Sequence, residues 1–133
     1  FLQGRDHISQ MPRGLTAIKS LQDQNVVLAA GADNVRDPFN TMGRSDPFET
    51  AALMVMAGHQ TPQDAFDLVS VNARKAMGLE KAALEIGDVA DFVAVEAPSL
   101  GTALADAPMN RRVFKEGILV AASDQRTVIY RGL

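Results

Sequence analysis

The residues best placed for chemistry follow an apolar stretch in the first third of the chain. Residues 26–32 read VVLAAGA and are followed at once by Asp33 and Asn34, with Asp37 and Pro38 shortly after. A short, nearly all-apolar run is typical of a strand buried on both faces of a parallel sheet. The carboxyl ends of such strands carry the functional loops of α/β sheets and barrels. We therefore expect Asp33 to be the first candidate for a functional carboxylate.

Residue type alone leaves other readings open for this loop. An aspartate in such a position is more often a turn or helix-capping residue than a catalytic one. Asp37 directly precedes Pro38, which is typical of a turn. Arg36 is either a substrate-orienting side chain or a solvated loop arginine, and the solvated reading is the commoner one.

The chain has two histidines and no cysteine, so a metal site would need His, Asp or Glu ligands. His59 lies at the end of an expected helix, where a cation is favoured, and this indicates a structural role. His7 lies in the loop that follows residues 1–3, and a role in substrate binding or gating is one alternative for it. Gln3 and Arg5 lie at the same end and are the better candidates for substrate contacts.

The composition is that of one globular domain. The 133 residues are 47% hydrophobic and 22% charged, with a formal net charge of −3. A mildly acidic chain without a basic patch is not expected to bind nucleic acid. No apolar run reaches the roughly 20 residues that span a bilayer, and no signal peptide is evident, which favours a cytoplasmic protein. The chain begins with Phe1 rather than Met, so we expect it to start partway through a larger protein.

The elements expected around Asp33 form a strand–helix–strand unit. Residues 1–3 read as the end of one strand, and apolar residues recur at helical spacing within residues 13–24. With the strand over residues 26–32, this order is that of a right-handed crossover. The following loop, residues 33–45, is long for a connection inside a domain, and such loops are often functional.

Three helices are predicted after this loop. Asp46 is the expected N-cap of a helix over residues 47–58, with Pro first and Glu third, as in a capping box. This helix is apolar on nearly every side, so we expect it to be well buried. Thr61 caps the next helix in the same way. A further short helix over residues 70–77 is expected to end at Gly78.

The pattern changes to short strands in the last third of the chain. A turn over residues 86–91 precedes a strand, a short helix, a two-stranded hairpin and a last strand. These elements are expected over residues 92–95, 99–107, 112–115 with 118–120, and 127–130. Glu116 and Gly117 form the hairpin turn. A domain boundary is placed within residues 79–86.

Several short motifs then occur in a distinctive order. The sequence GADN at residues 31–34, followed by DPF at residues 37–39, is the most specific of them. Shorter motifs are LQGR at 2–5, GLT at 14–16, TP at 61–62, NAR at 72–74, GL at 78–79 and IGDVADFV at 86–93. Over essentially the whole chain, this series resembles cytosine deaminase and its relatives in the amidohydrolase superfamily of metal-dependent hydrolases.

The resemblance implies an α/β fold, namely the C-terminal part of a (β/α)8 TIM barrel followed by part of a small β-sandwich. Residues 1–80 would form the barrel part, with strands seven and eight and the helices after them. Strand seven would end at residues 1–3, and strand eight would cover residues 26–32. Residues 81–133 would form the sandwich segment. The chain would then be the C-terminal third of such an enzyme.

The resemblance also implies roles for particular residues. Asp33 matches the aspartate after strand eight, which in the family contacts the metal and the attacking water and carries the proton to the leaving nitrogen. Asn34 and Phe39 match positions that line the substrate pocket, and Gln3 and Arg5 remain substrate-binding candidates. Asn34 replaces a second acidic residue of the bacterial cytosine deaminases and Phe39 a larger aromatic one, so the substrate need not be cytosine.

The family's remaining metal ligands have no counterpart in this sequence. Its His-x-His pair, its later histidines and its acid–base glutamate are absent, and catalytic zinc usually takes three protein ligands. The resemblance therefore implies a divalent zinc or iron ion held mostly by residues outside this chain. Asp33 would supply one contact to it.

The implied activity is hydrolysis of a C–N bond in a cyclic amidine or amide. Deamination of a small pyrimidine-like or triazine-like heterocycle is the example closest to the resemblance, and the isolated chain is expected to be inactive. The alternative is a catalytically incomplete fragment that acts as a structural or interaction module. An incomplete barrel leaves strand edges unpaired, and such edges pair with another chain, with a second copy or with a missing N-terminal part.

Overall fold

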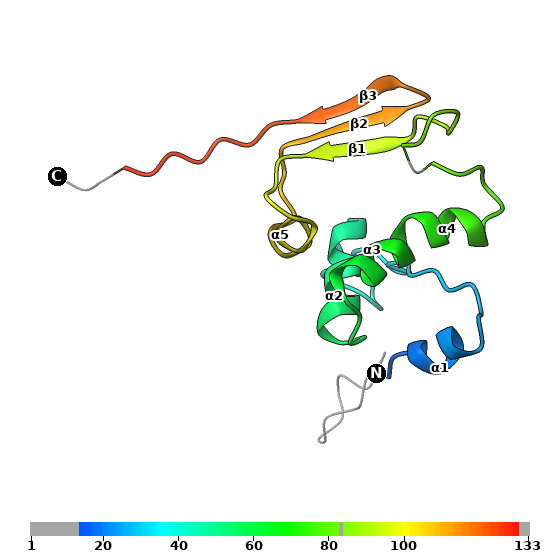
Figure 1. The fold of residues 1–133 in the computed structure, drawn as a ribbon. Helices are drawn as coiled ribbons and strands as arrows, with labels where there is room; N and C mark the ends of the chain where they lie inside the picture. Colours follow the sequence, from blue (N-terminus) through cyan, green and yellow to red (C-terminus); the bar gives the residue numbers. More distant parts are fainter. Residues whose placement is uncertain (1–13, 83, 131–133) are drawn as a thin grey trace, which may run out of the picture. The chain divides into compact units, whose positions relative to one another are not determined.

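The computed structural model describes residues 14–82 and 84–130, and the chain is mixed α/β (Figure 1). Its contacts divide it into two units, Phe1–Leu79 and Glu80–Leu133. The first unit holds α1 (Ile18–Asp23), α2 (Pro47–Met56), α3 (Pro62–Val69) and α4 (Val71–Ala76). The second unit holds β1 (Phe92–Val95), α5 (Leu100–Asp106), β2 (Arg111–Lys115) and β3 (Ile118–Ser123). No helix in the described ranges is long and apolar enough to cross a membrane.

The two central helices begin at the caps that the sequence predicts. The side chain of Asp46 accepts a hydrogen bond from the Phe48 amide at 3.1 Å, and α2 starts with a proline. The Thr61 hydroxyl oxygen accepts from the Asp64 amide at 3.1 Å and donates to the Asp64 carboxylate at 2.6 Å. These bonds satisfy amides that have no partner within the first helical turn. Both predicted helix starts are therefore confirmed.

The core of the first unit lies where α2 packs against α3. Ala51 and Ala65 are 0% exposed, and Phe48 and Leu68 are also buried. The prediction that the whole helix after Asp46 is buried on nearly every side is wrong, because Met56 is 69% exposed. The reason is that α3 covers one face of α2 and leaves the opposite face open.

The strand expected over residues 26–32 does not form. This segment has no regular secondary structure, and Val26 and Val27 are 46% and 42% exposed. A strand is defined by hydrogen bonds to a neighbouring strand, and the described residues place none beside it. The segment is instead tied to the helices, since the Ala30 amide donates to the Leu68 carbonyl oxygen at 2.9 Å.

The second unit contains an antiparallel sheet in the order β1-β2-β3, with α5 connecting β1 to β2 (Figure 1). Phe92 pairs with Phe114 across β1 and β2, and their rings stack with centroids 4.5 Å apart. The predicted hairpin is confirmed, and Glu116 and Gly117 both have positive φ in its turn. The last strand, expected over residues 127–130, does not form, because this exposed segment pairs with none of the described strands.

Candidate functional site

Asp33 begins a loop that runs from residue 33 to residue 45, which we name the Asp33 loop. Asp33 itself is exposed, and its φ of 58° lies in the left-handed region. Aspartate tolerates this conformation better than most residues, but it is uncommon and must be supported by its surroundings. Three residues earlier, the bond from Ala30 to Leu68 ties the chain to the end of α3. Asp33 therefore follows an anchored segment and is open to solvent.

The carboxylate of Asp37 organises the Asp33 loop. One of its oxygens, Oδ1, accepts hydrogen bonds from the amides of Phe39 at 2.9 Å and Asn40 at 2.8 Å. The other, Oδ2, accepts from the side-chain amide of Asn34 at 2.6 Å. An aspartate that binds amides two and three residues ahead is a common turn device. The turn expected at Asp37 is thus observed, and the same carboxylate also binds Asn34, the residue after Asp33.

These hydrogen bonds set the ionisation of Asp37. The bond from the Asn40 amide is the largest cause that lowers the pKa of the Asp37 carboxyl below its ordinary value of 3.8. Partial desolvation opposes this, while the bonds from the Asn34 side chain and the Phe39 amide add to it. Donated hydrogen bonds favour the charged form because they stabilise its negative oxygens. Asp37 is therefore a carboxylate at neutral pH.

Asn40 and Gly43 close the same loop. The Asn40 side-chain amide donates to the Asn34 carbonyl oxygen at 2.9 Å, and the Asp37 amide donates to the Asn40 carbonyl oxygen at 3.2 Å. Gly43 is buried against this pair. A Cβ at Gly43 would lie 2.6 Å from Asn40 Nδ2 and 3.0 Å from the Asn34 carbonyl oxygen. An alanine here would displace the Asn40 side chain and crowd the Asn34 carbonyl oxygen, which the sequence pattern does not reveal.

The residues predicted to act together lie partly in this loop. Asp33, Asn34 and Phe39 occur in it, with Asn34 and Phe39 both bonded to Asp37. The Asn34 amide nitrogen is thus engaged within the loop, and Phe39 is 44% exposed. The other two substrate-binding candidates, Gln3 and Arg5, lie outside the described residues, as do His7 and the strand end expected at residues 1–3.

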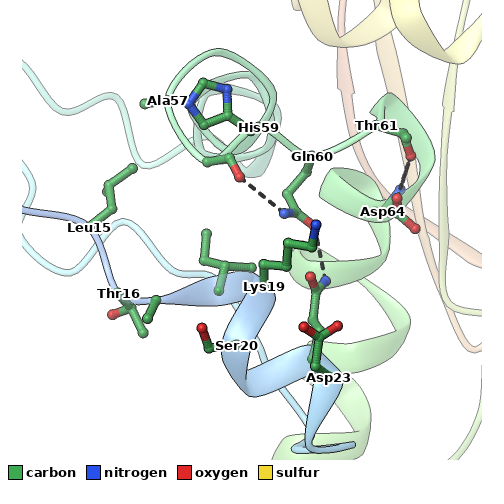
Figure 2. Close-up of a pocket in the computed structure, with 14 residues that line it drawn as sticks. Leu15, Thr16, Lys19, Ser20, Asp23, Ala57, His59, Gln60, Thr61 and Asp64 are labelled. Carbon is green, nitrogen blue, oxygen red and sulfur yellow. Dashed lines mark hydrogen bonds between the residues drawn. The ribbon is translucent and has the colours of Figure 1, made fainter.

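A hollow of about 560 Å³ lies elsewhere in the first unit, between α1 and the turn from α2 to α3 (Figure 2). Lys19, Asp23, His59 and Gln60 are among its polar lining residues. Gln60 is fixed there, because it accepts from the Gln22 side chain at 2.9 Å and its own amide donates to the Gly58 carbonyl oxygen at 3.0 Å. The lining does not include Asp33 or its loop, so this hollow and the Asp33 loop are separate features.

The described residues do not hold a metal site of their own. Within residues 14–82 and 84–130, no three His, Asp or Glu side chains gather closely enough to hold a metal ion. His59 lies just past the end of α2 with a positive φ of 54°, as part of the turn into α3. Asp33 can contribute at most one ligand, so the described residues do not fit a catalytic metal by themselves.

Comparison with protein families identifies the family to which the chain belongs. The amidohydrolase family matches residues 1–127, which is nearly the whole sequence. The chain therefore belongs to the amidohydrolase family, in agreement with the resemblance drawn from its motifs. A comparison with curated proteins finds no significant match.

Two solved structures share the fold of this chain. The chain is similar to 5-methylcytosine deaminase from Klebsiella pneumoniae liganded with 5-fluorocytosine, with a TM-score of 0.72, 20% identity and 97% of this chain covered. The same deaminase liganded with phosphonocytosine gives a TM-score of 0.73 and 20% identity over 98% of this chain. The match covers 32% and 33% of those chains, so this chain spans about a third of their length.

Proposed function

We propose that this chain is part of a metal-dependent amidohydrolase that hydrolyses C–N bonds of cyclic amidines or amides, in the manner of a cytosine deaminase. The observation that carries the proposal is the fold likeness to a deaminase solved with 5-fluorocytosine, over 97% of the chain. Membership of the amidohydrolase family, whose members are generally metal-dependent, supports the same reaction class. The substrate would be a small nitrogen heterocycle.

In this proposal residues 1–80 belong to a (β/α)8 barrel and residues 81–133 to a small β-sandwich. Residues 26–32 would become a barrel strand once neighbouring strands supply partners for its backbone groups. Their apolar composition and their present exposure at Val26 and Val27 both support this, because such a run gains stability only when it is covered. Asp33 would then stand at the carboxyl end of the strand.

Asp33 is the proposed catalytic residue. Its carboxylate is exposed rather than paired within the core, so it is available to a substrate and to a water molecule. A carboxylate in this position can take the proton of the attacking water and deliver it to the leaving nitrogen. Asn34 and Phe39, on the same loop, are proposed to contact the ring, together with Gln3 and Arg5. A zinc or iron ion would be held mainly by residues other than those described, with Asp33 as one contact.

The test uses the complete amidohydrolase that contains this sequence and compares Asp33→Ala with Asp67→Ala. Ammonia release is measured with cytosine, 5-methylcytosine and triazine-type rings. General acid–base catalysis contributes about 10²- to 10⁴-fold, so we expect Asp33→Ala to lower kcat by at least about 100-fold. Asp67 accepts a bond from Gln63 within α3, and its loss should leave kcat within about twofold. A wild-type rate for Asp33→Ala, with circular dichroism unchanged, would refute the catalytic role.

A second candidate function is that of an interaction module, and the exposed apolar side chains of β3 in the second unit favour it. Ile118, Leu119 and Val120 in β3 are 68%, 50% and 58% exposed, and β3 is an edge strand. An edge of this kind pairs readily with another chain or with a second copy. Metal analysis, ammonia release and sedimentation of the 133-residue chain separate the two functions. Stoichiometric metal with turnover would exclude the module, whereas an inactive oligomer would support it.

A further inference from the structure

The Asp33 loop is fixed on both sides of its first residue. Upstream, the Ala30 amide is bonded to the Leu68 carbonyl oxygen at 2.9 Å. Downstream, Asn34 is held at two points: its side chain donates to Asp37 at 2.6 Å, and its carbonyl oxygen accepts from Asn40 at 2.9 Å. Asp33 is the residue directly before Asn34, and its left-handed φ of 58° lies between these attachments. The path of the chain through Asp33 therefore depends on how Asn34 is held.

We infer that Asp37 is a positioning residue, which orients the Asp33 carboxylate by holding Asn34 in place. This inference rests on the role proposed for Asp33. The carboxylate of Asp37 joins two parts of the loop, because Oδ1 binds the amides of Phe39 and Asn40 while Oδ2 binds the side chain of Asn34. Without the second link the turn at residues 37–40 can persist, but Asn34 is then held only by the bond from Asn40 to its carbonyl oxygen, so the chain through Asp33 is less restricted.

One substitution separates the two functions of the Asp37 carboxylate, which are to form the turn at residues 37–40 and to hold the Asn34 side chain. In Asp37→Asn the remaining carbonyl oxygen can still accept from the Phe39 and Asn40 amides, so the turn is kept. Its new NH2 group would face the NH2 group of Asn34, and two donors cannot form a hydrogen bond. The double variant Asn34→Asp with Asp37→Asn reverses donor and acceptor. It restores one link between the two side chains at the same net charge.

A displacement of about 1 Å in a catalytic group can cost about 100-fold in rate. We therefore expect Asp37→Asn to lower kcat by about 10- to 100-fold in the complete enzyme. KM should rise as well, because Asn34 is proposed to contact the ring. The double variant should recover kcat at least about fivefold relative to Asp37→Asn. The matched control is Asp67→Asn, which removes a carboxylate that binds Gln63 within α3 and should leave both constants within about twofold.

The hydrogen bond between Asn34 and Asp37 can also be observed directly, without an activity measurement. The side-chain amide of Asn34, observed by NMR after selective ¹⁵N labelling, should shift in the wild-type protein as Asp37 is protonated, which occurs below its ordinary pKa of 3.8. This shift should be strongly reduced in Asp37→Asn, because the carboxyl bonded to this amide is gone. If the link is seen but Asp37→Asn keeps kcat within twofold, the positioning role is refuted and the proposed function stands. If the wild-type enzyme releases no ammonia from any ring, the proposed function fails, and the positioning role fails with it.

Discussion

Gly43→Ala tests how tightly the Asp33 loop is packed. The new Cβ would lie 2.6 Å from Asn40 Nδ2 and 3.0 Å from the Asn34 carbonyl oxygen. The Asn40 side chain must move, which breaks its 2.9 Å bond to that oxygen. A lost hydrogen bond costs about 0.5–1.5 kcal/mol, and overpacking against the carbonyl adds about 1 kcal/mol. Alanine also restricts the unfolded chain, which stabilises the folded form by about 0.4–1 kcal/mol. We therefore expect the stability of the loop to fall by about 1 kcal/mol in total.

Amide hydrogen exchange at Phe39 and Asn40 measures this loss, because both amides are bonded to Asp37 within the loop. A change of 1.4 kcal/mol is tenfold in an equilibrium constant, so exchange should become about fivefold faster. Gly31→Ala is the matched control. Nothing lies within 4 Å of the place that a Cβ would take at Gly31, and its φ is not positive, so this substitution should not speed exchange.

A double variant provides the outcome that would contradict the argument. Asn40→Ala removes the hydrogen bond without a clash, and once that side chain is gone the Asn34 carbonyl oxygen is the one that remains of the three atoms nearest to the new Cβ. The two substitutions should therefore cost less together than the sum of their separate costs, by about 1 kcal/mol. Strictly additive costs, or a Gly43→Ala variant that exchanges as slowly as wild type, would show that Gly43 is not required by close packing.

Two further predictions concern pH and the hairpin turn. The pKa of Asp37 is lowered in the folded loop, so its charged form contributes stability above pH 3.8, which is lost as the pH falls below that value. Exchange in the loop, corrected for its intrinsic pH dependence, should accelerate as the pH falls below 3.8 in wild type, and Asp37→Asn should lack this acceleration. Glu116→Asn should raise the free energy of unfolding by about 0.5 kcal/mol, because φ is 51° at this position and asparagine before glycine favours such turns. Urea denaturation measures the gain, and a loss of stability would contradict the turn assignment.

The features that the sequence predicts well are those made by residues close together along the chain. Asp46 and Thr61 cap helices by bonding amides two and three residues ahead, and Glu116 with Gly117 closes a two-residue turn. An apolar run followed by polar residues makes Asp33 a candidate, and its role stays a prediction. The importance of Asp37 is only partly visible in the sequence, because its turn is local, whereas its bond to Asn34 depends on the path of the loop.

The features decided by tertiary structure depend on partners far away in the chain. Residues 26–32 and 127–130 have the composition of strands, but neither segment forms one, because a strand needs a neighbour and the described residues supply none. Composition determines which backbone segments prefer an extended form. Only the assembled structure determines whether another strand pairs with these segments. The close approach of Asn40 to Gly43 is likewise set by the path of the loop.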